Sequence, residues 1–236
     1  MTTNSNKSSI IQNKFLKDNS IAYILAGGQS MRFNGDPKGL QTLGNQSIIS
    51  HCISRLNAQF SQIYINSHLK EYEQLSLPIV ADHPTRQLQG PLAGLFSCMQ
   101  HQTEHHPQAE WLFICPCDSP FLPLDLRQRM DRALKLLKKA SSERFSTEKL
   151  KNEILAISFS YQGVLQPTFS LWHLRLFEQL KMAVTLKKWG GLKIFLNSIN
   201  DKTAIIEYPE QSFDPFFNIN SQQDLTIAEQ HLHNLT

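Results

Sequence analysis

The stretch Ile21–Leu40, IAYILAGGQSMRFNGDPKGL, joins an apolar run to a glycine-rich loop that ends in a lysine. Its first five residues are typical of a strand in the middle of a parallel sheet, covered on both faces. Gly27 and Gly28 end this run and let main-chain N–H groups approach a ligand with no Cβ in the way. Arg32 and Lys38 add two positive charges that could meet a polyphosphate. The stretch predicts a nucleotide site at the end of a buried strand.

This loop does not match the common phosphate-loop patterns. The Walker pattern needs Gly-Lys-Ser/Thr, whereas Asp36 and Pro37 separate Gly35 from Lys38, and the pattern G-x-G-x-x-G is absent. A turn after a strand, with Arg and Lys side chains in solvent, is an equally good interpretation of two adjacent glycines taken alone.

Length and composition agree with an enzyme of one domain. The chain has 236 residues and 41% hydrophobic content, which suit one α/β domain with a continuous core. Residues 1–20 are rich in Asn, Ser and Lys, so we expect a flexible N-terminal tail before a single domain over residues 21–236. The net charge is only +3 and, apart from the region after Lys135, basic residues are scattered. We therefore expect no nucleic-acid partner.

The cysteine content favours a reducing compartment. We expect a cytoplasmic protein without a membrane span, because no secretory signal or long apolar segment is evident. The four thiols, Cys52, Cys98, Cys115 and Cys117, are too sparse for a disulfide framework, and we expect Cys115 and Cys117 to be small buried apolar groups.

Polar residues follow the next two predicted strands. After a helix over Gln46–Gln59, the run Ile63–Ile65 reads as a strand that ends at Asn66, and Pro78–Ala81 as a strand followed by Asp82. Open α/β sheets bind ligands at the carboxyl ends of their strands, which favours a ligand contact. Capping of the next helix explains Asn66 equally well.

A helix is expected from Gly90-Pro91-Leu92-Ala93-Gly94 onward, with the proline in its first turn. It carries His101-Gln102-Thr103-Glu104-His105, which matches the zinc-hydrolase pattern H-x-x-E-H. Pro107 follows at once, although that pattern needs a continuing helix. We therefore interpret His101–His105 as the polar end of a surface helix.

The strand Trp111–Cys115 is followed by Asp118 between two prolines. A carboxylate just past a buried strand, opposite a phosphate-binding loop, is where Mg²⁺ would be held while phosphate oxygens and waters complete its shell. A turn-forming Asp before Ser119-Pro120 is an equally good reading on spacing alone. Cys115 and Cys117 cannot complete a four-ligand zinc site by themselves.

The remaining chain continues the alternation of strands and helices. Lys138–Glu153 has no apolar face, and we expect a solvated excursion there. A final helix is preceded by Asn218 and Asn220, and Asn220 or Ser221 would cap it. Together these elements predict a three-layer α/β/α Rossmann-like sheet that is mostly parallel and made mixed by a hairpin. The further elements are a helix over Leu124–Ala140, a hairpin of Ile154–Ser160 and Gln166–Leu171 around Gln162-Gly163, and a strand over Ala204–Tyr208.

Separated strings in this order resemble the molybdenum cofactor guanylyltransferases, which are built on a GT-A-like nucleotidyltransferase sheet. The resemblance covers nearly everything after residue 20. It is carried by Leu25-Ala26-Gly27-Gly28 with its loop through Lys38, Gly90-Pro91-Leu92-Ala93-Gly94, Pro116-Cys117-Asp118-Ser119-Pro120, Gln166-Pro167-Thr168 and Asn218-Ile219-Asn220.

The resemblance implies an Mg²⁺-dependent enzyme that transfers GMP from GTP to the terminal phosphate of molybdenum-molybdopterin, releasing pyrophosphate. The expected partners are these two substrates, with other proteins of cofactor biosynthesis or molybdoenzyme maturation. The implied catalytic residues are Lys38, Arg32 and Asp118, and the implied metal ligands are Asp118 and Asn220. Nucleotide contacts are implied for Leu25, Ala26, Gly27, Gly28, Lys38, Asn66, Asp82 and Asp118.

One departure from the family pattern concerns the loop lysine. Family members usually place Asp directly before it, whereas Pro37 lies between Asp36 and Lys38. Pro-Lys resembles related cytidylyl- and sugar-nucleotide transferases instead. A transferase that uses CTP or a sugar phosphate, and a nucleotide-binding module without catalysis, therefore remain as alternatives.

Overall fold

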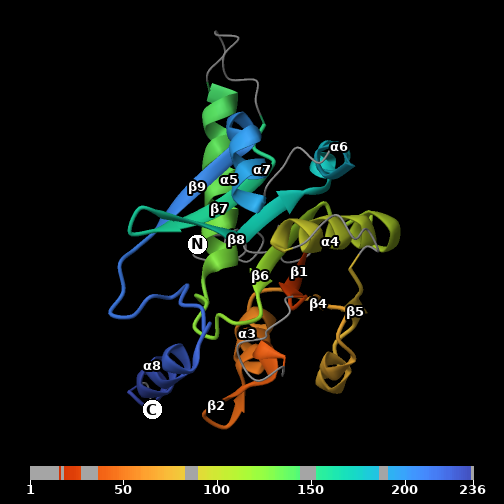
Figure 1. Ribbon diagram of the computed structural model, residues 1–236. Helices are drawn as coiled ribbons and strands as arrows, with labels where there is room; N and C mark the ends of the chain where they lie inside the picture. The colour runs from red at the N-terminus through yellow and green to blue at the C-terminus, as the bar shows by residue number, and fades with distance from the viewer. Residues whose placement is uncertain are drawn as a thin grey trace, which may run out of the picture.

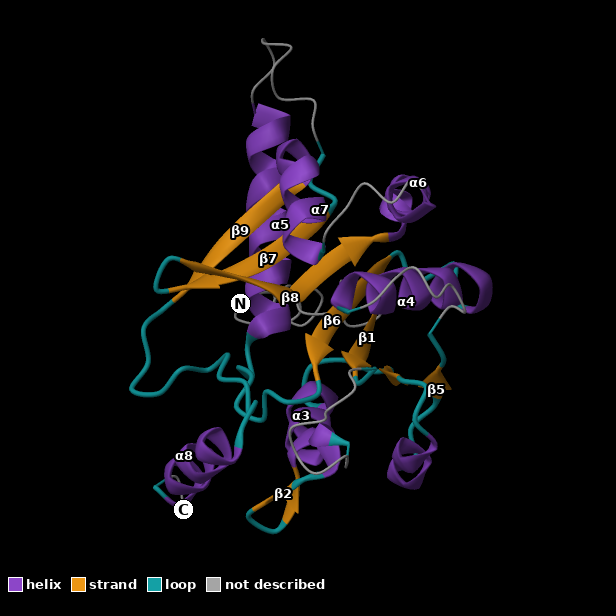
Figure 2. Ribbon diagram, viewed as in Figure 1, coloured by secondary structure: helices purple, strands orange, loops and turns teal. Residues whose placement is uncertain are grey.

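A computed structural model describes residues 16, 19–27, 37–82, 90–143, 153–185 and 191–234. Its centre is a seven-stranded sheet in the order β5-β4-β1-β6-β8-β7-β9, with helices on both faces (Figures 1 and 2). The strands are β1 (Ser20–Leu25), β2 (Thr42–Leu43), β3 (Gln46–Ser47), β4 (Ile63–Asn66), β5 (Ile79–Val80), β6 (Trp111–Pro116), β7 (Ala156–Tyr161), β8 (Val164–His173) and β9 (Thr203–Tyr208). The helices are α3 (Ile48–Asn57), α4 (Pro91–His105), α5 (Leu126–Glu143), α6 (Phe177–Thr185), α7 (Leu192–Ser198) and α8 (Gln222–His233). Short 3₁₀ helices are η1 (Lys38–Leu40), η2 (Lys70–Leu75), η4 (Leu174–Leu176) and η5 (Asn200–Lys202).

The sheet is mixed and mostly parallel, which confirms the predicted architecture. Strand β1 is parallel to β4 and β6, and β4 is parallel to β5, whereas β8 is antiparallel to both β6 and β7. Leu25, the last residue of β1, is in register with Asn66 of β4 and Pro116 of β6. Gly27, Ser67 and Asp118 therefore follow three strands that end at one edge.

Strand β1 is buried on both faces, as its apolar run predicts. Ala22 and Ile24 pack into one core with α3 and α5, while Ile21 and Tyr23 pack into another with α4, α6 and α7. This separation explains the continuous apolar run, because successive side chains of a strand point to opposite faces. A third, smaller core joins Leu43 and Ile48 to residues of α8.

The predicted hairpin is also confirmed. Gln162 and Gly163 both have left-handed backbone conformations, with φ of 48° and 74°, as a two-residue turn of type I′ requires. The second strand of the hairpin begins at Val164, two residues earlier than predicted.

The expected flexible tail is wrong at its carboxyl end. Leu16 is fully buried in the core beside α5, and its N–H donates to Asp131 Oδ1 at 3.2 Å. Asn19 exchanges hydrogen bonds of 3.0 Å with Glu110 through its side chain. Leu16 thus anchors this segment on the core, because burying a leucine stabilises by about 1.5–3 kcal/mol. Residues 1–15 lie outside the described part of the chain.

The segment expected to be a solvated excursion, Lys138–Glu153, is exposed where it is described, at Lys138, Lys139 and Glu153, but its first residues still belong to a helix. Helix α5 continues through Glu143, since Lys, Ala and Ser do not break a helix that is already propagating. Glu153 pairs with Arg175, which holds the pKa of that exposed carboxyl below its ordinary value. Residues 144–152 are not described.

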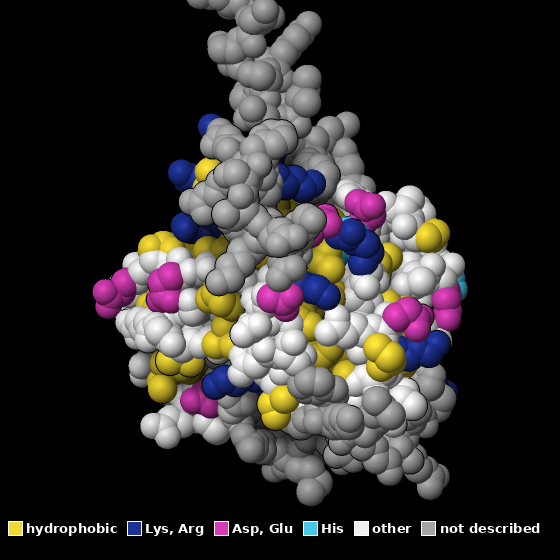
Figure 3. Space-filling model, turned by 90° about the horizontal axis from the view of Figure 1, so that it is seen from above, with side chains coloured by type: hydrophobic (Ala, Val, Ile, Leu, Met, Phe, Trp, Pro, Cys, Tyr) yellow, Lys and Arg dark blue, Asp and Glu magenta, His cyan; other side chains and the backbone are white. Residues whose placement is uncertain are grey.

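The visible surface carries mixed charge. On the face in Figure 3, dark blue Lys and Arg side chains are interspersed with magenta Asp and Glu. Among the described residues, none of the helices combines the length and apolarity needed to cross a membrane.

Candidate active site

The loops after β1, β4 and β6 are tied together at the carboxyl edge of the sheet. Leu25 O accepts a hydrogen bond from Cys117 N at 3.1 Å, and Ala26 N donates to Asn66 O at 2.8 Å. Ser67 Oγ donates to Ala26 O at 3.0 Å. The amide of Ala26 is thus engaged within the protein, and the carbonyl oxygens of Leu25 and Ala26, which each accept one hydrogen bond, keep a second lone pair for a nucleotide.

Lys38 lies over the end of β6 because η1 packs closely there. The turn is closed by Leu40 N, which donates to Pro37 O at 2.9 Å. A Cβ at Gly39 would stand 2.9 Å from Tyr72 Oη and 3.3 Å from Cys117 Sγ, so only glycine fits. This close packing sets the Lys38 side chain next to the residues that follow Cys117.

The Lys38 ammonium contacts both predicted metal ligands. It forms an ion pair with Asp118 Oδ2 and donates to Asn220 Oδ1 at 2.7 Å. The side chains of Lys38 and Asp118 are only 16% and 15% exposed. Three segments far apart in the sequence therefore meet at one charged cluster.

The loop before α8 is held against the loop after β6 by two hydrogen bonds. Ile219 N donates to Asp118 O at 2.9 Å, and Ser119 Oγ donates to Asn218 Oδ1. Neither the role of Ser119 nor the partner of Asn218 was predicted from the sequence. The only signal was that both residues lie inside the two resembled strings.

Ser221 caps α8, which resolves the alternative between Asn220 and Ser221. Its hydroxyl accepts from Asp224 N at 3.2 Å, while Asp224 Oδ2 accepts from Asn220 N and Ser221 Oγ, both at 2.8 Å. Burial alone would raise the pKa of Asp224, but these hydrogen bonds and the nearby Lys38 ammonium hold the pKa below its ordinary value. Asn220 is left to point its amide oxygen at Lys38.

The residues present fit a divalent cation such as Mg²⁺. Asp118 Oδ1 is buried and has no hydrogen-bond partner among the described residues. The Asp118 carboxylate and Asn220 Oδ1 together offer the hard oxygen donors that Mg²⁺ prefers, and Mg²⁺ usually needs only one or two protein carboxylates when phosphates are present.

A second polar cluster lies at the ends of β4 and β5. Asn66 Nδ2 donates to Val80 O at 3.1 Å and to Asp82 Oδ1 at 2.9 Å, and His68 Nδ1 lies 3.7 Å from Asp82 Oδ2. A Cβ at Gly27 would stand 2.7 Å from Asp82 Oδ2. The structure thus brings Asn66, Asp82 and Gly27 together, and their contact with a nucleotide stays a prediction.

Gly94 was not predicted to belong to this cluster. A Cβ there would lie 2.6 Å from Asn66 Oδ1 and 2.9 Å from Leu25 Cδ2. The first turn of α4 therefore packs directly on the Asn66 amide, which explains the glycine in Gly90-Pro91-Leu92-Ala93-Gly94. The predicted site residues Gly28 and Arg32 lie outside the described ranges.

The cysteines beside the site are buried thiols, as expected. Burial, with the nearby Asp118 charge, raises the pKa of Cys117 to about 12. Cys52 Sγ donates to Ser119 O at 3.2 Å. A thiol with a raised pKa is a poor nucleophile and a poor metal ligand at neutral pH.

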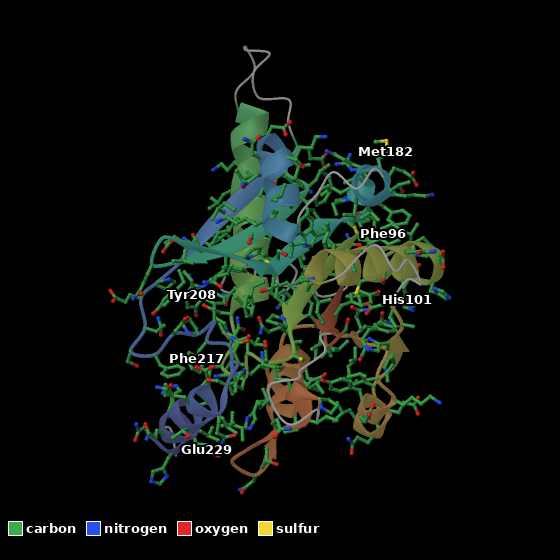
Figure 4. The ribbon with its side chains drawn as sticks, viewed as in Figure 1. Phe96, His101, Met182, Tyr208, Phe217 and Glu229 are labelled. Atoms are coloured by element: carbon green, nitrogen blue, oxygen red, sulfur yellow. The ribbon has the colours of Figure 1, made fainter. Side chains whose placement is uncertain are left out.

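The H-x-x-E-H pattern does not form a zinc site among the described residues. Helix α4 ends at His105, as Pro107 predicted, and His101 lies near that end (Figure 4). The rings of His101 and His105 stack at 4.6 Å instead of converging on one point, and His101 Nδ1 is 3.1 Å from Tyr23 Oη. The structure supports the surface helix end.

Comparison with known proteins defines the class. A family model described as a MobA-like NTP transferase domain matches residues 22–202. A molybdenum cofactor guanylyltransferase of Rhodopseudomonas palustris (strain BisB5) is 32% identical over 88% of this chain and 91% of its own length. A protein of the same name from Cupriavidus metallidurans is 32% identical over 92% of this chain and 95% of its own length. The chain therefore belongs to the molybdenum cofactor guanylyltransferase family of MobA-like NTP transferases.

Solved structures share the fold. Molybdopterin-guanine dinucleotide biosynthesis protein A from Archaeoglobus fulgidus superposes with a TM-score of 0.61 at 19% identity, covering 91% of this chain and 99% of that one. The 4-diphosphocytidyl-2C-methyl-D-erythritol synthase of Anaerococcus prevotii gives 0.64 at 13% identity, covering 93% and 99%. The shared sheet is common to nucleotidyltransferases with different names, so the fold alone does not select the substrate.

Proposed function

We propose that this enzyme transfers GMP from GTP to the terminal phosphate of molybdenum-molybdopterin, giving a guanine dinucleotide cofactor and pyrophosphate. The observation that carries the proposal is the meeting of Lys38, Asp118 and Asn220 at the carboxyl edge of the sheet, where open α/β folds bind ligands. Relatives about 30% identical over nearly the whole chain carry the guanylyltransferase name.

The cluster of Asn66 and Asp82 would receive the base. Asn66 Nδ2 holds Asp82 Oδ1, so the carboxylate is fixed in orientation and its Oδ2 is directed toward Gly27. A carboxylate accepts hydrogen bonds only, which suits the adjacent N–H donors on the Watson–Crick edge of guanine. An acceptor such as the Asp82 carboxylate therefore favours GTP over CTP, because the Watson–Crick edge of cytosine includes two acceptors, O2 and N3.

The phosphate side would be handled by charge and alignment. Lys38 and Arg32 would bind phosphate oxygens, and Asp118 with Asn220 would hold Mg²⁺. The cation would neutralise charge on the triphosphate. No strong protein base is required, because the attacking phosphate is already ionised near neutral pH.

In the reaction, an oxygen of the pterin phosphate attacks the α-phosphorus of GTP. A new P–O–P bond forms as the bond from the α-phosphorus to the bridging oxygen breaks, and pyrophosphate leaves with that electron pair. The protein contributes by holding the attacking and leaving oxygens in line and by stabilising the charge that moves between them.

The direct test incubates the protein with molybdopterin, Mg²⁺ and each nucleoside triphosphate in turn, and identifies the covalent product by mass. We expect the dinucleotide with GTP only. A product with CTP or with a sugar phosphate would favour the related transferases, and nucleotide binding without pyrophosphate release would favour the binding module.

Asp118→Asn provides the matched test of the site. It keeps the side-chain shape but removes the charge, so turnover should fall at least about a hundredfold, roughly 2.7 kcal/mol, and the Mg²⁺ requirement should rise. Asp125→Asn is the control, because Asp125 pairs instead with Arg129 and Tyr208. An unchanged Mg²⁺ titration in Asp118→Asn would exclude this assignment.

A further inference from the structure

The Lys38 ammonium stands between the two oxygen donors that the proposed function gives to a metal ion. Its Nζ pairs with Asp118 Oδ2 and donates to Asn220 Oδ1 at 2.7 Å. One nitrogen thus contacts both protein ligands at once. A cation within bonding distance of both oxygens would overlap that nitrogen, because Mg–O distances are about 2.0–2.1 Å. The ammonium and a metal ion bound through Asp118 Oδ2 and Asn220 Oδ1 therefore compete for the same two oxygen donors.

The free protein has a physical reason to keep a cation there. Asp118 is 15% exposed, and its Oδ1 lacks a hydrogen-bond partner among the described residues. A carboxylate in such a place is costly without a compensating charge. Lys38 supplies that charge from the neighbouring loop, and the tight packing of Gly39 on Tyr72 and Cys117 fixes the point from which its side chain reaches.

Lys38 also lies on the loop expected to bind phosphates. Phosphate oxygens offer its ammonium a stronger, multiply charged partner than a single carboxylate. Movement of the flexible four-carbon stem from Asp118 to phosphate would expose Asp118 and Asn220 at the moment when additional cation ligands arrive.

We infer that Lys38 holds the place of the divalent cation in the nucleotide-free protein and is exchanged for it when a nucleotide triphosphate binds. The inference rests on the proposed function for its metal ligands. It adds an order to binding: the protein takes up the cation together with the nucleotide, and the cation alone binds poorly because it must first displace Lys38.

The exchange can be tested without turnover by titrating Mn²⁺ into the nucleotide-free protein and following free Mn²⁺ by electron paramagnetic resonance. Lys38→Met removes the ammonium but keeps an apolar stem. At one pH and ionic strength, we expect it to bind Mn²⁺ roughly tenfold more tightly than the wild type, because no ion pair has to be broken. Lys38→Met/Asp118→Asn should lose this gain.

Lys193→Met is the matched control, since it removes the same charge from an exposed position on α7. It should bind Mn²⁺ as the wild type does. A second readout is thermal unfolding: Mg²⁺ alone should raise Tm more in Lys38→Met than in the wild type, because a ligand stabilises in proportion to its affinity for the folded state. Lys38→Gln serves as a second neutral variant if the methionine variant does not fold.

Equal Mn²⁺ affinity in Lys38→Met, Lys38→Gln and Lys193→Met would overturn the inference. A gain that survives Asp118→Asn would also overturn it, because the cation would then bind elsewhere. These outcomes are separate from those of the proposed function. Formation of the guanine dinucleotide by the wild type, together with an unchanged Mn²⁺ affinity in the Lys38 variants, would leave the function standing and the exchange refuted.

Discussion

The Asp82 carboxylate lies so close to Gly27 that it leaves no room for a side chain there. With Asp82 Oδ2 only 2.7 Å from where a Cβ would stand, no side chain fits at Gly27 unless the carboxylate moves. The same carboxylate is held by Asn66, so its movement would also disturb that amide. A glycine that sequence analysis associated with main-chain contacts is therefore required by a side chain two strands away.

The first prediction concerns this contact. Gly27→Ala should displace the Asp82 carboxylate and raise KM for the nucleotide about tenfold, equivalent to roughly 1.4 kcal/mol of lost binding. Steady-state kinetics on Gly27→Ala, Asp82→Ala and the double variant would measure the coupling. If the clash is the cause, adding Gly27→Ala to Asp82→Ala should cost little more. Fully additive effects would contradict the explanation.

The site residues that could be predicted from the sequence are those that lie in a recognisable motif next to a strand or helix end. Lys38 and Asp118 were assigned from loops at strand ends, Asn220 was assigned from the family resemblance, and the structure brings the three together. Ser119 and Asn218 were missed as a pair, since their hydrogen bond joins residues 99 positions apart. The local sequence around Ser119 does not indicate which distant loop will accept a hydrogen bond from its hydroxyl.

At the scale of elements, boundaries were less predictable than the elements themselves. The main sheet strands and helices α3, α4, α5 and α8 fall where periodicity placed them. The hairpin of β2 and β3 and the short helices α6 and α7 were not predicted. Two-residue strands and helices of seven to nine residues are too short for their periodicity to be read from one sequence. Whether such short elements form depends instead on how they pack against the rest of the fold.

The second prediction concerns the segment before β1. Leu16 is fully buried, so Leu16→Ala should lower the free energy of unfolding by about 2–5 kcal/mol and Tm by roughly 5–15 °C. Leu124→Ala is the control because Leu124 is 58% exposed, and it should change Tm little. Equal, small effects of both substitutions in calorimetry would restore the interpretation of residues up to 20 as a tail.

The end of α4 leads to a prediction about pH. Burial, with the charges of His105 and His106, lowers the pKa of His101 below its ordinary value of 6.5, although Glu104 acts in the opposite direction. Tyr23 and Tyr64, from the adjoining strands, complete its surroundings. Because the unfolded chain takes up the proton more readily, the stability linked to His101 is full above about pH 6.5 and is lost as pH falls toward the folded-state pKa.

The third prediction follows from that sign. His101→Gln removes the titrating group, so it should lose less stability than the wild type between pH 7 and pH 5. The difference should be small, on the order of 1–2 °C in Tm, because His101 is partly exposed and its interactions are screened. Thermal unfolding of both proteins across this range would check it, and parallel Tm curves would disprove the linkage.

At the scale of the whole molecule, all four thiols lie inside the fold. Cys52, Cys98, Cys115 and Cys117 are buried, and burial raises the pKa of each, in the case of Cys117 to about 12. Cys98 belongs to one core and the other three to the core on the opposite face of the sheet. The reactivity of these thiols therefore reports on how readily the core on each face of the sheet opens.

The fourth prediction is that the native protein resists thiol reagents. Labelling with an aromatic disulfide at pH 7.5 should be slower than in the denaturant-unfolded chain by at least about a hundredfold, since reaction waits for opening of the core. Added denaturant should accelerate all four thiols together if the two cores unfold as one unit. Early labelling of Cys98 alone would show that the layer of α4, α6 and α7 opens separately.

The large sequence separation between Lys38 and Asn220 has a consequence for the order in which parts of the proposed site form during synthesis of the chain. These two residues lie 182 positions apart, and Asp118 O accepts a hydrogen bond from Ile219 N, 101 positions further along the chain. On the ribosome, the base-side residues Gly27, Asn66 and Asp82 emerge long before Asn220. A nascent chain can therefore bring the proposed base-binding residues together while the proposed cation site still lacks Asn220. The catalytic cluster closes only when the final helix arrives to complete the small core it shares with Leu43 and Ile48.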